Sequence, residues 1–261
     1  MDNRFPLRLT RLFLLVIWTA LMLPPVQAGR LILFSDARLK AKFSAFGCMV
    51  WARAVCAILG IDVGSTGHRV QNTGFTVCNH VSYVDILVMA SLSPSVFVSK
   101  MEVKSWPLIG WMARLGGTVF IDRRSALASW KSLSDVETAL SHGVNVVTFP
   151  EGTTTNGSET GDFKRMLFEA PARAGVPVIP VSMKYYTGDN SAEIPWYGEM
   201  TLLPHLWSLL GIRRIKSFLY FSRAITFGAR TGKRSVSRNY LSAKSRESVM
   251  SGLYSLDRWF A

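Results

Sequence analysis

The sequence predicts an α/β fold, in which a mostly buried sheet is flanked by helices and preceded by an N-terminal pair of hydrophobic, membrane-associating helices. After about residue 66, short β-branched or aromatic runs alternate with helical patterns, which is typical of a sheet covered on both faces. Two long apolar segments precede this alternation. With 261 residues, 49% of them hydrophobic, the chain can bury one full core. We therefore expect an N-terminal helical region over residues 1–65 and a globular domain over residues 66–261.

The first apolar segment is "LFLLVIWTALML", residues 12–23, which three arginines precede and Pro24-Pro25 follow. With the small residue Ala28 beyond it, this arrangement is similar to a secretory signal peptide. As a transmembrane helix the run is short, because twelve residues span about 18 Å against a hydrocarbon core of roughly 30 Å. A third interpretation is a helix lying in one leaflet, with its arginines at anionic headgroups on the cytoplasmic side.

The second apolar segment, residues 42–60, is hydrophobic nearly all round and carries only Lys42 and Arg53 as charges. It ends at Gly60, a residue that suits a helix C-terminus. Two such helices predict a membrane-docking hairpin, and the alternative is that the second helix packs on the core.

The remaining elements follow from residue type and periodicity. Short runs rich in β-branched or aromatic residues predict strands over residues 74–78, 95–99, 117–121, 144–149, 176–183 and 217–222. Helices are expected between them, over roughly residues 83–92, 107–115, 125–142 and 164–174, with a last one near 240–260.

Charge and cysteine content narrow the function classes. The net charge of +13 favours acidic partners, among which nucleic acid, anionic lipid headgroups, phosphorylated substrates and acidic carrier proteins all qualify. The mean hydropathy of +0.21 favours the lipid side. Cys48, Cys56 and Cys78 lie among apolar neighbours without a CxxC pattern, so we expect reduced core cysteines and neither a disulfide framework nor a metal site.

The stretch "CNHVSYVDI", residues 78–86, places His80 and Asp85 five residues apart where a predicted strand gives way to a helix. Ser82 and Asp85 form the S-x-x-D pattern of a capping box, which predicts a helix start at about Tyr83. In the simplest interpretation Asp85 only caps the helix and His80 is an exposed loop residue. However, a loop position for His80 also lets the carboxylate fold back onto an imidazole nitrogen, which would leave the other nitrogen as a general base.

A nucleophile belonging to the protein is not evident. The sequence contains no G-x-S-x-G and no cysteine in an activating context. The simplest arrangement therefore makes a substrate hydroxyl the nucleophile, with His80 removing its proton during attack on an activated acyl group.

The segment "NHVSYVDI" resembles the N-H-x-S-x-x-D motif of the glycerophospholipid acyltransferases, the family that includes 1-acylglycerol-3-phosphate acyltransferase. Further blocks of that family occur in its order over about residues 75–185, namely "SKMEVKSWPLIGWM" (99–112), "GGTVFIDR" (116–123), "FPEGTTTNG" (149–157) and "VPVIPVSM" (176–183). One block alone is a weak signal, whereas several in order at plausible spacing are specific.

The resemblance implies that His80 is the general base and Asp85 its orienting partner. It also implies that Arg123 contacts the phosphate of the acceptor, as an arginine fork at a strand end is able to do, and an ordinary surface ion pair is the alternative. Lys100 is implied to be a cation lining the site, and a solvated lysine is the alternative.

The "FPEGT" block implies that Glu151, Gly152 and Thr153 shape the acceptor site. A carboxylate does not hold a phosphate directly, so Glu151 would bond glycerol hydroxyls, position the loop, or pair with a basic residue. Many family members have arginine where this sequence has Thr154, which removes one expected phosphate contact. Lys164 or Arg165 could replace it, or the acceptor could be a different lysolipid.

The implied activity is O-acyl transfer in phospholipid biosynthesis, from acyl-CoA or acyl carrier protein to the free hydroxyl of a lysophospholipid. The first acceptor to consider is 1-acyl-sn-glycerol-3-phosphate, which would give phosphatidic acid. The alternatives are another lysolipid, such as lyso-ornithine lipid, or a membrane-bound acyl hydrolase. Neither a cofactor nor a metal is needed, because the acyl donor is a co-substrate. A non-catalytic lipid- or nucleic-acid-binding module would explain the charge but not the ordered blocks.

The implied location is the cytoplasmic side of the inner membrane, because such acyl donors are cytosolic. The N-terminal run would then be an uncleaved anchor, and the mature protein would retain residues 1–28. We expect the basic surface to face anionic lipid and acidic substrates, and no nucleic acid.

Overall fold

A computed structural model describes residues 4–68, 73–122, 126–188, 193–226 and 237–260. Within these residues the strands form one sheet in the order β1-β7-β6-β2-β5-β3-β4. Neighbouring strands run parallel, except that β6 and β7 are antiparallel. The strand bounds are β1 Ile61–Gly67, β2 Phe75–Cys78, β3 Ser95–Lys100, β4 Val119–Ile121, β5 Asn145–Thr148, β6 Val178–Thr187 and β7 Ile215–Phe221.

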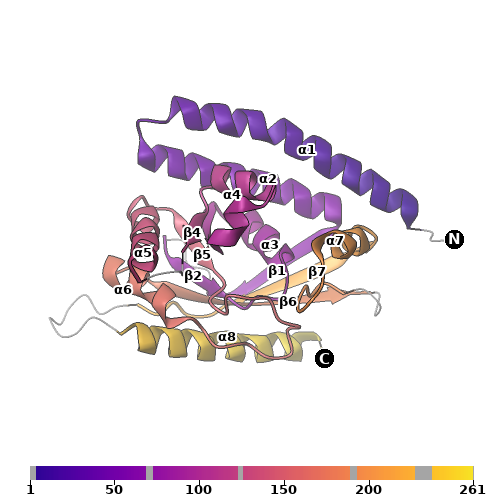
Figure 1. Ribbon diagram of the computed structural model, residues 1–261. Coiled ribbons are helices and arrows are strands. Elements are labelled where there is room, and N and C mark those ends of the chain that lie inside the picture. The colour runs from indigo at the N-terminus through magenta and orange to yellow at the C-terminus, as the bar shows by residue number, and fades with distance from the viewer. Residues whose placement is uncertain (1–3, 69–72, 123–125, 189–192, 227–236, 261) are drawn as a thin grey trace.

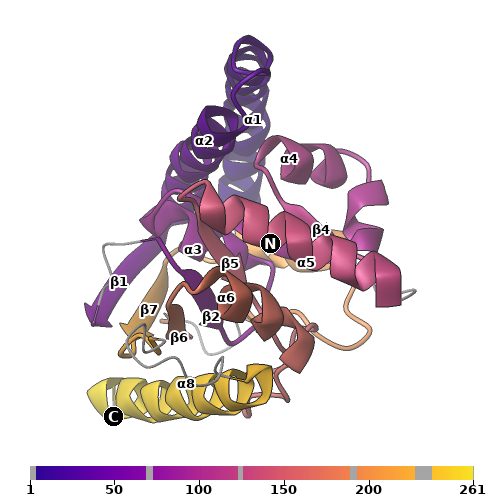
Figure 2. The same ribbon diagram turned by 90° about the vertical axis from the view of Figure 1, so that its left-hand side faces the viewer.

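Helices cover both faces of this sheet (Figure 1), which confirms the predicted α/β fold. The helices α2, α3 and α7 lie on one face, and α5, α6 and α8 lie on the other. Helix α1 forms an outer layer over α2 (Figures 1 and 2). The bounds are α1 Phe5–Ile32, α2 Ala37–Leu59, α3 Val84–Leu92, α4 Ile109–Leu115, α5 Ala126–Ser141, α6 Glu169–Ala174, α7 Leu202–Leu210 and α8 Arg238–Phe260, with short 3-10 turns η1 (Met101–Ser105) and η2 (Arg165–Phe168).

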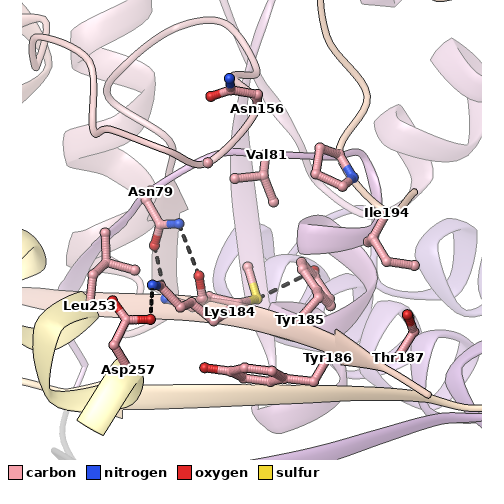
Figure 3. A pocket seen from close by; sticks show the side chains of 13 residues that line it. Asn79, Val81, Asn156, Lys184, Tyr185, Tyr186, Thr187, Ile194, Leu253 and Asp257 are labelled. Atoms are coloured by element: carbon pink, nitrogen blue, oxygen red, sulfur yellow. Dashed lines mark hydrogen bonds and ion pairs between the residues drawn. The ribbon is translucent and has the colours of Figure 1, made fainter. Parts of the chain in front are cut away.

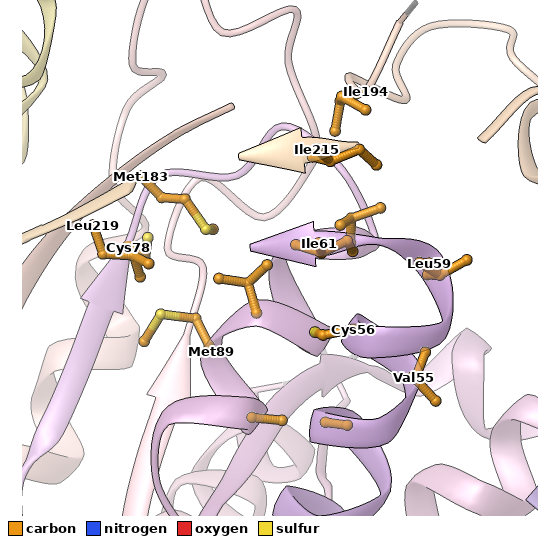
Figure 4. Packing of buried hydrophobic residues seen from close by; sticks show 14 of the residues in the cluster. Val55, Cys56, Leu59, Ile61, Cys78, Met89, Met183, Ile194, Ile215 and Leu219 are labelled. Atoms are coloured by element: carbon orange, nitrogen blue, oxygen red, sulfur yellow. The ribbon is translucent and has the colours of Figure 1, made fainter. Parts of the chain in front are cut away.

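The core consists of two apolar clusters separated by the sheet. Successive residues of a strand point to opposite faces, so Val146 enters the cluster under α5 and α8 while Val147 enters the cluster under α2 and α3. Figure 4 shows the second cluster, to which Cys56 of α2, Met89 of α3 and Leu219 of β7 all belong. Because both faces of the central strands are buried, the sheet is a rigid platform for the loops at its ends.

Helix α1 is longer than the sequence predicts. It continues through Pro24-Pro25, where the apolar run was expected to stop, and its 28 residues correspond to about 42 Å. Packing against α2 explains the continuation, because Val26 fits against Gly47 and the Phe43 ring occupies the space that a side chain at Gly29 would need. Tertiary contacts therefore outweigh the loss of two backbone hydrogen bonds at the prolines.

One strand and one α-helix were not predicted at all. Strand β1 extends the sheet back to Ile61, so residues 61–65 belong to the sheet although the sequence placed them with the N-terminal helices. This edge strand contains Gly64 and Gly67, which weaken the strand pattern, and it is held by parallel pairing with β7. Helix α7 was also missed. Its Pro204 reads as a helix breaker in the sequence, but it lies in the first turn of the helix, where proline is tolerated.

Candidate active site

The carboxyl ends of the central parallel strands bring the predicted site residues to one edge of the sheet. His80 follows the end of β2 by two residues, and Glu151 follows the end of the adjacent β5 by three. Lys100 is the last residue of β3, on the far side of β5. Loops leaving this edge are where open α/β sheets place their ligands.

His80 and Asp85 meet through their side chains. His80 Nδ1 lies 2.7 Å from Asp85 Oδ2, and the carboxylate is fully buried while the imidazole is 16% exposed. The ring also stacks on Phe149, with 4.1 Å between ring centroids and an interplanar angle of 14°. A carboxylate beside Nδ1 accepts a hydrogen bond from Nδ1–H and so favours the neutral tautomer protonated at that nitrogen. The other nitrogen, Nε2, is then the proton acceptor.

Asp85 accepts hydrogen bonds on both of its oxygens. Besides His80, Oδ2 takes the backbone N–H groups of Val81 at 2.7 Å and Ser82 at 3.0 Å. The hydroxyl of Tyr185 donates to Oδ1 at 2.7 Å. Burial and the neighbouring carboxylate of Asp85 raise the pKa of the Tyr185 hydroxyl well above its ordinary value, so it is a stable donor. The carboxylate is therefore fixed from four directions.

The capping box that the sequence predicts forms only in part. Asp85 does reach back to the N–H of Ser82, as the motif requires. The Ser82 hydroxyl, however, lies 3.4 Å from the N–H of Val84, while the N–H of Asp85 donates to the Ser82 carbonyl in a turn. Helix α3 accordingly begins at Val84, with Tyr83 as an N-cap whose side chain makes no capping bond.

Glu151 is 5% exposed and uses both carboxylate oxygens on backbone N–H groups. Oε1 accepts from His80 at 2.8 Å, and Oε2 accepts from Gly161 at 2.8 Å. Burial raises the pKa of this carboxyl group, and the two N–H bonds partly offset that shift. Of the three roles considered for Glu151, the geometry matches the positioning of the loop.

The segment from 152 to 161 wraps around His80. Gly152 has a φ of +73°, a turn conformation that side chains rarely adopt, and Thr155 N–H donates to the His80 carbonyl at 3.0 Å. From α8, Arg246 donates to the Thr160 carbonyl at 2.7 Å and to the Gly161 carbonyl at 3.1 Å. Arg246 was not identified from the sequence, because only the fold brings α8 to this loop.

Asn79 joins the His80 loop to β6. Its side chain both donates to and accepts from the backbone of Met183, at 3.0 Å and 2.8 Å. Strand β6 continues to Thr187, four residues beyond the predicted end, and this extension carries Tyr185 to Asp85. Tyr185 was also missed, since it is 100 residues from Asp85 and belongs to no quoted motif.

The other predicted site residues lie further from His80 or outside the described residues. Arg123 is not among the residues that the structure describes. Lys100 is exposed at the same edge, two strands away from β2, which is a backbone separation of about 10 Å. Thr153 is exposed and Thr154 is half-buried in the loop after Gly152.

A pocket of about 330 Å³ lies beside the His80 loop, on the side of α8 (Figure 3). Asn79 and Val81 form one wall, and Tyr186 of β6 forms another. An ion pair between Lys184 and Asp257 crosses it. His80 and Asp85 are not among its lining residues, so this pocket adjoins the histidine–aspartate pair without containing it.

Comparisons with known proteins identify relatives along most of the chain. A family model described as "Acyltransferase" matches residues 62–184. The lyso-ornithine lipid O-acyltransferase of Rhizobium meliloti is 32% identical over 241 residues, which are 86% of this chain and 80% of that protein. The 1-acyl-sn-glycerol-3-phosphate acyltransferase of Neisseria gonorrhoeae is 36% identical over 159 residues, which are 60% of this chain and 62% of that protein.

A second lyso-ornithine lipid O-acyltransferase, from Pseudomonas aeruginosa, is 40% identical over 161 residues, covering 61% of this chain and 62% of that protein. The crystal structure of PlsC, the 1-acyl-sn-glycerophosphate acyltransferase of Thermotoga maritima, has a similar fold. It matches with a TM-score of 0.63 at 21% identity, over 96% of this chain and 98% of that one.

The fold and these matches define an O-acyltransferase enzyme. The chain belongs to the acyltransferase family, as the relative from Rhizobium meliloti shows over most of both lengths. The resemblance to the glycerophospholipid acyltransferases is thus confirmed.

Proposed function

We propose that the protein transfers a fatty acyl group from a thioester donor to the free hydroxyl of a lysolipid, with His80 as the general base. The observation that carries this proposal is the buried Asp85 carboxylate, which holds His80 Nδ1 at 2.7 Å and leaves Nε2 as the proton acceptor. A hydrogen-bonded carboxylate fixes both the tautomer and the orientation of such a histidine.

In the proposed reaction the lysolipid hydroxyl attacks the thioester carbonyl carbon while His80 Nε2 takes the hydroxyl proton. The new C–O bond forms, the C–S bond breaks, and the leaving thiolate receives the proton from His80. Direct transfer, without an acyl-enzyme intermediate, is supported by the burial of the neighbouring hydroxyl and thiol groups. Ser82 and Cys78 are both fully buried, and burial raises the pKa of the Cys78 thiol well above its ordinary value.

Two acceptors have specific support. Thr154 in place of an arginine removes a phosphate contact, and the relatives from Rhizobium meliloti and Pseudomonas aeruginosa are lyso-ornithine lipid O-acyltransferases, so we place lyso-ornithine lipid first. The relative from Neisseria gonorrhoeae supports 1-acyl-sn-glycerol-3-phosphate, for which Arg123 would hold the phosphate. We propose acyl-CoA or acyl carrier protein as the donor, since either is an acidic partner for a chain of net charge +13.

Membrane association through α1 belongs to the same proposal. Both α1 and α2 are long and apolar enough to cross a membrane by length and composition, but only 6% of the apolar window of α1 is buried, against 44% for α2. Cleavage at Ala28 would cut α1 and release Arg11, which bonds to carbonyls of the body. These observations support an uncleaved anchor, which we place on the cytoplasmic side of the inner membrane.

The test is an acceptor panel with purified full-length protein. Labelled acyl-CoA and acyl carrier protein are each offered with lyso-ornithine lipid, 1-acyl-sn-glycerol-3-phosphate, lysophosphatidylethanolamine or no acceptor. Formation of the diacyl lipid with at least one acceptor supports transfer, and the better acceptor identifies the headgroup. Release of free fatty acid at the same rate with and without acceptors would instead identify a hydrolase.

A further inference from the structure

The connection between β3 and β4 is a compact hairpin, residues 101–115, in which η1 packs against α4. Gly110 makes this packing possible, because a side chain there would overlap the backbone of Lys104. The hairpin buries Gly110 and Leu115 but leaves four large apolar side chains at its tip in contact with solvent. Their exposed fractions are 38% for Trp106, 58% for Leu108, 38% for Ile109 and 41% for Trp111.

The tip is a rare and strained turn. Leu108 has φ +58° and ψ −54°, and the N–H of Ile109 donates to the Pro107 carbonyl at 2.6 Å, which together make a classic γ-turn. Among the described residues, Leu108 is the non-glycine residue with positive φ. A glycine would adopt this conformation without strain, so neither the turn nor the core accounts for a leucine here.

The hairpin lies beside α1 (Figures 1 and 2). Arg30, in the last turn of α1, donates to the Leu115 carbonyl at 3.1 Å and so ties the two elements together. Helix α1 exposes a series of apolar side chains of its own, among them Phe13, Val16 and Leu21. The hairpin, with its exposed apolar side chains, thus lies beside the helix that we place at the membrane.

The charges around the tip favour an anionic lipid surface over a second copy of this basic chain. Lys100, Lys104 and Arg114 are exposed on the hairpin or next to it, against the single exposed acid Glu102. Basic residues near a membrane surface are attracted to anionic headgroups, and tryptophan prefers the membrane–water interface.

We propose that the hairpin 101–115 is a second membrane-contacting element, which inserts Leu108 and its flanking tryptophans into the leaflet occupied by α1. The inference rests on the proposed function in that α1 lies at the membrane and the lysolipid acceptor is reached there. Insertion at two points, α1 and the hairpin, fixes the orientation of the sheet edge that carries His80 relative to the lipid surface.

The experiment compares three full-length variants labelled with an environment-sensitive fluorophore, on vesicles of phosphatidylcholine and phosphatidylglycerol that contain lipids with acyl-chain nitroxides. Leu108→Cys reports on the hairpin, Phe13→Cys on α1, and Tyr254→Cys on the exposed face of α8 beyond the sheet. Wild-type protein taken through the same reaction is the blank for Cys48, Cys56 and Cys78. We expect a blue shift and nitroxide quenching at positions 108 and 13, and neither at position 254.

Quenching at position 13 without quenching at position 108 overturns the inference, because of the two elements only α1 then contacts the membrane. Absence of quenching at both positions, while acyl transfer proceeds, overturns membrane contact by either element and leaves the proposed function intact. A shift at 108 that grows with protein concentration without vesicles assigns the tip to a second copy, which also overturns the inference. Quenching at 108 in a protein that transfers no acyl group supports the hairpin and contradicts the proposed function.

A second variant separates insertion from folding. Leu108→Gly keeps the γ-turn and removes its strain, so the melting temperature should not fall. Removing the inserted side chain should weaken vesicle partitioning about tenfold. Tyr254→Ala, which removes exposed apolar surface on α8, is the matched control and should partition like the wild type. Unchanged partitioning of Leu108→Gly contradicts insertion of Leu108.

Discussion

Asp85 carries more of the site geometry than any other described residue, because one buried carboxylate receives His80, two backbone N–H groups and Tyr185. From the sequence Asp85 could either cap the helix or orient His80, and the structure shows that its carboxylate reaches the imidazole because His80 lies on the loop just before the first turn of α3. Tyr185 and Arg246 could not be predicted, because their roles arise from strand β6 and helix α8, which are distant in sequence.

At Tyr185 we predict that phenylalanine lowers kcat about tenfold and leaves KM for the lysolipid nearly unchanged, since a hydrogen bond to a charged group contributes about 1.5–3 kcal/mol. The change removes the hydroxyl that donates to Asp85 Oδ1 but leaves the packing of the ring nearly unaltered. Steady-state kinetics over a range of pH provide the measurement. We expect the acidic limb of the profile of kcat against pH to shift relative to that of the wild type. Tyr220→Phe on β7 is the matched control. Equal kcat and pH profiles in Tyr185→Phe and wild type would show that the hydroxyl has no positioning role.

For Glu151 the expected effect is on stability as a function of pH. Burial raises the pKa of its carboxyl group above the ordinary value of 4.5, so the folded protein binds this proton more tightly than the unfolded chain does. The stabilisation of the protonated group is therefore fully present below the unfolded pKa and is lost as pH rises through the folded pKa.

Melting temperatures of wild type and Glu151→Gln, measured across mildly acidic pH, test this expectation. The difference, wild type minus variant, should decrease as pH rises from about 4.5, because only the wild type loses a bound proton there. The exposed Glu159→Gln, in the same loop, should show no such trend. A difference that stays constant or increases with pH would contradict the burial argument.

At the scale of elements, the buried Arg11 is one of the residues that hold helix α1 to the body. Arg11 is 6% exposed and donates to the carbonyls of Leu210 at 3.1 Å, Ile212 at 2.5 Å and Arg213 at 3.0 Å, at the end of α7. Indole groups add contacts between the helices, since Trp18 donates to the Trp51 carbonyl at 3.2 Å. Sequence reasoning placed the N-terminal arginines at lipid headgroups, and the structure assigns this one to the protein.

Replacing Arg11 by methionine should lower the free energy of unfolding by about 2–4 kcal/mol, because it leaves buried carbonyls without a donor. It should also make α1 accessible to limited proteolysis at lower protease concentration. Thermal unfolding in detergent and a proteolysis time course provide the measurements, with the exposed Arg38→Met as the control. If both variants behave like the wild type, Arg11 does not dock α1.

Elements with strong local patterns were predicted well, and those defined by tertiary contacts were not. The strands β2, β3 and β5 and the helices α3, α5 and α8 lie within a few residues of their predicted bounds, since each has a clear periodicity. Strand β1 depends on pairing with β7, and the second half of α1 depends on α2, so neither has a sufficient local signal.

For the whole molecule, the sheet positions the histidine–aspartate pair, and the apolar N-terminal helices lie over one of its faces. The carboxyl edge of the sheet carries the histidine–aspartate pair, and the hairpin 101–115 leaves the same edge after β3. Helix α1, which exposes apolar side chains, lies beside this hairpin (Figure 2). The net charge of +13 then favours approach to anionic lipid and to acidic acyl donors. Composition left several acidic partners open, and only the fold brings α1 and the hairpin side by side.

The central claim is that His80 is the general base of acyl transfer, and the turnover of His80→Ala tests it most directly. Transfer of a labelled acyl group to the best lysolipid of the panel is compared for wild type, His80→Ala and the control His142→Ala, which lies outside the site after α5. Removal of a general base should lower kcat by about 10²–10⁴-fold, with the melting temperature unchanged and full activity in the control. A folded His80→Ala protein that turns over at the wild-type rate would contradict the account.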